Sequence, residues 1–88
     1  LSPQEWHDLH SVAYGLRSPD HALPALQRWL AVATPLWLTR PLAERELLIR
    51  YLWQGWSWQE IAGTSTSVGQ KALIRQLRAI LAACLPPA

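Results

Sequence analysis

Apolar residues recur every three or four positions along most of the chain, and runs of alternating β-branched residues, which would indicate strands, are absent. This pattern predicts an all-α fold. The first helix opens on Ser2-Pro3-Gln4-Glu5, a capping box with proline at the first helical position, and Pro35 is expected to end or kink the second. The five predicted helices span about residues 3–15, 23–34, 42–53, 59–63 and 68–83.

The stretch Gly-Trp-Ser-Trp-Gln-Glu-Ile-Ala at residues 55–62 predicts a sharply defined junction between two helices. Ser57 suits the N-cap, where its hydroxyl accepts a bond from a free backbone N–H, and Glu60 can bond back to the N–H of Ser57. Trp56 and Ile61 flank these positions as a hydrophobic staple, an apolar contact that sets the direction of the incoming chain. Gly55 would end the preceding helix in the left-handed conformation.

The last predicted helix separates apolar from cationic side chains. Its apolar stripe consists of Leu73, Leu77, Ile80 and Cys84. At about 100° per residue, Lys71, Arg75 and Arg78 fall on the opposite side. A row of cations facing away from the core would attract a phosphate backbone, although an ordinary solvated face would show the same charges.

The segment ERELLIRYLWQGWSWQEIA at residues 44–62 resembles the helix-turn-helix of sigma-factor region 4, a pattern shared with LuxR-type regulators and phage Q-type antiterminators. The resemblance covers about residues 40–83 and implies a helix-turn-helix of a phage or plasmid regulator, in which a short helix braces a second helix in the DNA major groove. It implies contacts to bases or phosphates from Ser67, Gln70 and Lys71, and to phosphates from Arg75 and Arg78.

The resemblance weakens after residue 62 and leaves a second interpretation open. The family usually has Leu and then Gly after the EIA triplet, whereas this chain has Gly-Thr-Ser-Thr at residues 63–66. The chain is then either a DNA-binding transcription regulator with a reshaped turn, or a helical protein-interaction module that has lost its DNA contacts. Such a module would bind RNA polymerase or another regulator. Because tryptophan is enriched at binding hot spots, Trp29, Trp37 and Trp58 are candidates for its partner surface.

Two parts of the chain differ in charge and composition. The net charge of +2 is too small to indicate nucleic-acid binding by itself, but six of the eight Lys and Arg residues lie in the helix-turn-helix part, residues 39–88. Residues 1–38 are rich in tryptophan and leucine. We expect this N-terminal part either to pack onto the other as one compact domain, or to pair two chains in a homodimer whose symmetry would match two DNA half-sites.

No catalytic, metal or cofactor site is predicted. His7, His10 and His21 do not supply three convergent ligands, and the lone Cys84 excludes an internal disulfide. The chain has no nucleophile motif and no phosphate-binding glycine loop, so we do not expect an enzyme. Apolar runs stay well below the ~20 residues that span a bilayer, and no signal peptide is visible. We expect a cytoplasmic protein, and a start without Met suggests a fragment.

Overall fold

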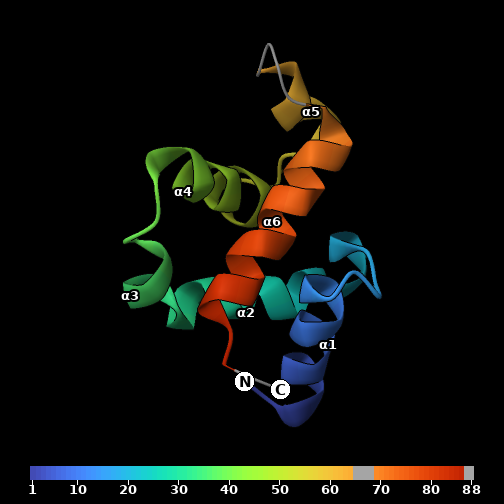
Figure 1. The fold of residues 1–88 in the computed structure, drawn as a ribbon, viewed down its shortest axis with the longest axis vertical. Helices are drawn as coiled ribbons and strands as arrows, with labels where there is room; N and C mark the ends of the chain where they lie inside the picture. Colours follow the sequence, from blue (N-terminus) through green and yellow to red (C-terminus); the bar gives the residue numbers. More distant parts are fainter. Residues whose placement is uncertain (65–68, 87–88) are drawn as a thin grey trace.

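The computed structural model describes residues 1–64 and 69–86, which form helices joined by turns (Figure 1). The α-helices are α1 (Pro3–Ala13), α2 (Leu23–Val32), α3 (Thr34–Trp37), α4 (Leu42–Leu48), α5 (Trp58–Gly63) and α6 (Gln70–Cys84). Two shorter segments are the 3-10 helix η1 (Pro19–Ala22) and the π-helical turn η2 (Ile49–Trp53), which continues α4. The all-α prediction is confirmed, but the described residues contain six α-helices where five were predicted.

The additional helix begins at the end of the predicted second helix, where Pro35 was expected to end or kink it. Helix α2 ends at Val32, and α3 restarts at Thr34 with Pro35 in its first turn. Proline has no N–H to continue the α2 ladder, but it is tolerated in a first turn, where that N–H would have no partner. The indole Nε1 of Trp37 donates to the carbonyl of Leu30 at 2.8 Å, which ties α3 back onto α2.

Helix α6 runs through the centre of the molecule and connects the two halves of the chain (Figure 1). It packs against α1, α4 and α5. Its buried side chains are Leu73, Leu77, Ile80 and Leu81. Cys84, which was assigned to this stripe, is only half-buried. Residues from both halves join a single hydrophobic core around α6.

The junction before α5 has the capping geometry predicted from the sequence. The Ser57 hydroxyl accepts from the backbone N–H of Glu60 at 3.1 Å, and the Glu60 carboxylate accepts from the N–H of Ser57 at 3.0 Å. These bonds lower the pKa of Glu60. Gly55 lies in the left-handed region with a φ of 74°, and Ile61 is buried while Trp56 packs partly against the core. The start of α5 is therefore determined by local hydrogen bonds.

Replacement of Ser57 by alanine should destabilise the fold by about 1 kcal/mol, because the N–H of Glu60 loses its acceptor. Ser18→Ala is the matched control, since Ser18 precedes η1 as its N-cap but makes no side-chain capping bond. Urea denaturation of both variants measures the difference. Equal losses of stability would show that the Ser57 cap contributes nothing specific.

Candidate nucleic-acid interface

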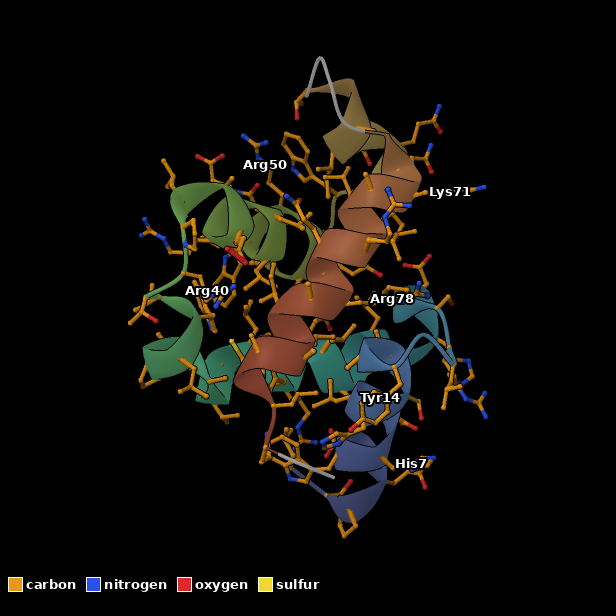
Figure 2. The ribbon with its side chains drawn as sticks, in the orientation of Figure 1. His7, Tyr14, Arg40, Arg50, Lys71 and Arg78 are labelled. Carbon is orange, nitrogen blue, oxygen red and sulfur yellow. The ribbon has the colours of Figure 1, made fainter. Side chains whose placement is uncertain are left out.

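A row of three cations follows the exposed side of α6, and we call Lys71, Arg75 and Arg78 the basic stripe. Lys71 and Arg75 are exposed, and Arg78 is half-buried. Figure 2 shows Lys71 projecting from the first turn of α6 and Arg78 further along on the same side. Helix α6 contains no acidic residue. Among residues 1–64 and 69–86, none of the three cations takes part in an ion pair, so their charge is available to a ligand.

Arg78 is held against the turn that follows α1. The centre of its guanidinium lies 4.0 Å from the position that a Cβ would take on Gly15, whose φ is 77°. Its Nε is buried and has no hydrogen-bond partner among the described residues. Because a helix C-terminus carries partial negative charge, it favours a cation at this place. Arg78 therefore contributes to the contact between α1 and α6 as well as to the basic stripe.

The loop between α1 and η1 lies beside the basic stripe, because its Gly15 adjoins Arg78. Tyr14, at the end of α1, is 62% exposed, and Figure 2 shows it below Arg78. Arg17 is exposed and lies 3.0 Å from the Nε2 of His21. We call the basic stripe together with Tyr14 and Arg17 the basic face. It combines cations with an exposed aromatic ring.

Three other arginines are paired with carboxylates outside this face. Arg28 lies 3.4 Å from Glu5. The other two pairs are Arg40 with Glu44 at 2.9 Å and Arg50 with Glu46 at 3.9 Å. The charged side chains are thus unevenly distributed although the net charge is small. The unpaired cations of α6 lie on one side of the molecule, and the paired Arg40 lies on the other (Figure 2).

A pocket of about 410 Å³ lies beside the start of α6, and we call it the junction pocket. Its walls come from η1, η2, the residues between η2 and α5, and the first turns of α2, α5 and α6. The lining residues are Asp20, Leu23, Tyr51, Gly55, Trp56, Ser57, Trp58, Gln59 and Gln70. Because Gln70 is the first residue of α6 and Lys71 follows it, the pocket and the basic stripe meet at the first turn of that helix.

An aromatic pair is part of the lining of the junction pocket. The rings of Tyr51 and Trp58 stack with centroids 4.0 Å apart, at 26° between their planes. The Tyr51 hydroxyl donates to the carboxylate of Asp20, which ties η1 to η2. Burial raises the pKa of Tyr51, and the bond to Asp20 raises it further. The phenol therefore keeps its proton and acts as a hydrogen-bond donor.

Arg50 steadies the outer side of the junction. Its guanidinium carbon lies 5.1 Å from the centre of a Trp56 ring, in cation–π geometry. One of its nitrogens also donates to the Thr64 hydroxyl at 3.3 Å. The sequence pattern did not indicate Arg50 and Tyr51 as parts of this region. Both lie within a helical segment, and only the fold brings them to residues 56–64.

The sequence-predicted contact residues are only partly described by the structure. Gln70, Lys71 and Arg75 are exposed on α6 and Arg78 is half-buried, whereas Ser67 lies outside the described residues. The predicted partner surface is not formed by the residues assigned to it. Trp29, Trp37 and Trp58 are only 1%, 7% and 8% exposed, because they fill the core. The exposed tryptophan is Trp53, at 77%.

The described residues contain no group of three or more His, Cys, Asp or Glu side chains that could hold a metal ion. No described helix is long and apolar enough to cross a membrane.

The family comparison decides what the chain is related to. The model of a tRNA-binding domain family matches residues 1–86, nearly the whole chain. The chain belongs to this tRNA-binding domain family. No curated protein and no solved structure matches it significantly.

This membership corrects the functional interpretation of the sequence. The resemblance to sigma-factor region 4 and LuxR-type regulators is misleading, and the prediction of a transcription regulator that binds double-stranded DNA is wrong, because the family points to RNA. The alternative of a module that binds RNA polymerase is not supported either. A capped short helix followed by a basic amphipathic helix arises from local packing rules, and those rules do not depend on which polyanion the helix meets.

Replacement of Tyr51 by phenylalanine should test the support of the junction pocket. The wild-type protein should lose stability as the pH rises past the ordinary tyrosine pKa of about 10, because the unfolded chain releases a phenol proton that the folded protein retains. Tyr51→Phe should be less stable by about 0.5–1.5 kcal/mol at neutral pH and should lose part of this alkaline dependence. Urea denaturation across a pH series measures both effects.

The control is Tyr14→Phe, which removes the hydroxyl of an exposed tyrosine. This variant should keep the wild-type stability at neutral pH. If Tyr51→Phe also keeps it, the bond between Tyr51 and Asp20 does not stabilise the fold.

Proposed function

We propose that this domain binds tRNA and that the basic face is its contact surface. The observation that carries the proposal is the basic stripe of α6, a row of cations without an ion pair among the described residues, in a member of a tRNA-binding family. The proposed role is binding, and it includes no chemical step.

The geometry of the basic face suits a folded RNA. Lys71 and Arg78 are seven residues apart, which is ~10 Å along a helix, so the basic stripe can reach several phosphates of one strand. The major groove of A-form RNA is too deep and narrow for side chains to read. Phosphate contacts along the outside of α6 need no entry into that groove. Tyr14 adds a ring on which an unpaired base can stack.

The modest charge has a consequence for affinity. Each phosphate that a protein cation neutralises releases counterions, so affinity falls linearly with salt on logarithmic scales. With few unpaired cations, the domain should bind RNA with moderate affinity and should depend strongly on ionic strength. A role as one contact among several on the same tRNA fits this property.

Replacement of both exposed cations in Lys71→Gln/Arg75→Gln should weaken tRNA binding and reduce the salt slope by about 1.5, since each lost phosphate contact contributes roughly 0.7–0.9. Arg28→Gln/Arg40→Gln is the matched control, because it removes the same charge from cations that are already paired. Fluorescence anisotropy with a labelled tRNA transcript at several salt concentrations gives both quantities.

Circular dichroism should first show that both double variants keep their helices. If the two variants lose affinity and salt slope equally, binding depends on overall charge and the basic face is not the contact surface. If the wild-type domain binds no tRNA, the proposed function is wrong.

A further inference from the structure

The junction pocket offers two amide side chains whose hydrogen-bonding groups are unused among the described residues. Gln59 lies in the first turn of α5 and Gln70 in the first turn of α6, and both line the pocket. Both are exposed, and neither makes a side-chain hydrogen bond within residues 1–64 and 69–86. A glutamine amide presents a donor group beside an acceptor, which is the pattern found along the edge of a nucleobase.

The remaining walls suit a flat aromatic guest. Trp56 is only partly buried and lines the pocket, while its ring is held by Arg50. The rings of Tyr51 and Trp58 stack on each other, and the Tyr51 hydroxyl donates a hydrogen bond to Asp20. Gly55 lines the pocket without a side chain, and apart from its chain neighbours no heavy atom lies within 4 Å of where its Cβ would be. The pocket is therefore unfilled at Gly55 and is lined by aromatic rings.

The surroundings of the pocket suit a phosphate. The N-cap of α6 is Gly69, and it makes no side-chain capping bond. The first N–H groups of a helix lack internal partners and favour an anion. Lys71 is exposed in the same turn. A nucleotide whose base occupies the pocket would thus have its phosphate near the beginning of the basic stripe.

We propose that the junction pocket holds one unpaired nucleobase of the bound tRNA, with Gln59 and Gln70 bonding its edge and Trp56 contacting its ring. The inference rests on the proposed function and adds a means of selecting the RNA. A base inside a duplex is stacked and paired along that edge, whereas a base in a loop or at an end is free to enter. The basic face provides attraction to any RNA, and the junction pocket favours RNA with an unpaired nucleotide.

The test compares two RNAs and two double variants. The RNAs are a tRNA transcript and a blunt, fully paired RNA duplex with the same number of nucleotides. Gln59→Leu/Gln70→Leu removes both amides at similar side-chain size. Gln54→Leu/Gln76→Leu is the matched control, because these glutamines are also exposed and do not line the pocket. Fluorescence anisotropy gives each affinity and its salt slope.

The wild-type domain and the control variant should bind the transcript more tightly than the duplex. Gln59→Leu/Gln70→Leu should weaken transcript binding roughly tenfold, as expected for two lost hydrogen bonds. Its duplex affinity and its salt slope should stay unchanged. Replacement of the basic-stripe cations, in contrast, should weaken the binding of both RNAs and lower the salt slope.

Other outcomes separate the two proposals. If the wild-type domain binds neither RNA, tRNA binding itself is wrong. The nucleobase pocket is overturned if the wild-type domain binds both RNAs equally, or if the two glutamine double variants bind alike. It is also overturned if Gln59→Leu/Gln70→Leu weakens the binding of both RNAs equally. In each of these cases the basic face stands.

A titration of the wild-type protein keeps the inference testable if a variant does not fold. Nucleoside 5′-monophosphates added to the ¹⁵N-labelled domain should shift the side-chain amides of Gln59 and Gln70 and the indole N–H of Trp56. Shifts confined to the backbone of residues 70–75 would indicate phosphate binding alone and would overturn the proposal.

Discussion

Burial of the apolar side of α6 is the interaction on which the rest of the structure depends. Each of Leu73, Leu77, Ile80 and Leu81 is at most 6% exposed. Burying a side chain of this size contributes roughly 1.5–3 kcal/mol, which is large beside the ~5–15 kcal/mol net stability of a small domain. Because these residues face α1, α4 and α5, the polar side of α6 has to face solvent. The exposure of the basic stripe is thus a consequence of packing.

The tryptophans around Ser57 have different roles, which explains their unusual place in a turn. Trp58 points inward and stacks on Tyr51, so α5 is anchored to η2 through an aromatic contact. Trp56 stays at the surface, where Arg50 covers one of its rings. The serine between them caps α5. This division of roles leaves an open space with aromatic walls between η1, the junction and the start of α6.

The proposed RNA binding, in a chain of such low net charge, requires that the charges be sorted in space. Arg28, Arg40 and Arg50 are paired with carboxylates, whereas α6 has cations and no acid. The resulting field is local and acts over about a Debye length, ~8 Å at physiological salt. A ligand would therefore be attracted by the cations of α6 chiefly when it lies within about this distance. Discrimination among RNAs then has to come from shorter-range contacts, and the junction pocket lies where such contacts can form.

The sequence by itself determined the helices, the Ser57 cap and the opposition of cations to apolar residues on α6, because these depend on contacts within a few residues. It did not determine that Pro35 would start a new helix instead of kinking an old one, since Trp37 stabilises that restart by bonding to α2. It also did not determine whether Trp29, Trp37 and Trp58 face the core or the solvent, because an apolar ring suits a core as well as a partner surface. Only the tertiary structure joined Asp20, Tyr51, Gln59 and Gln70 around one pocket. These residues are far apart in the chain, and long-range packing around α6 decides which of them meet.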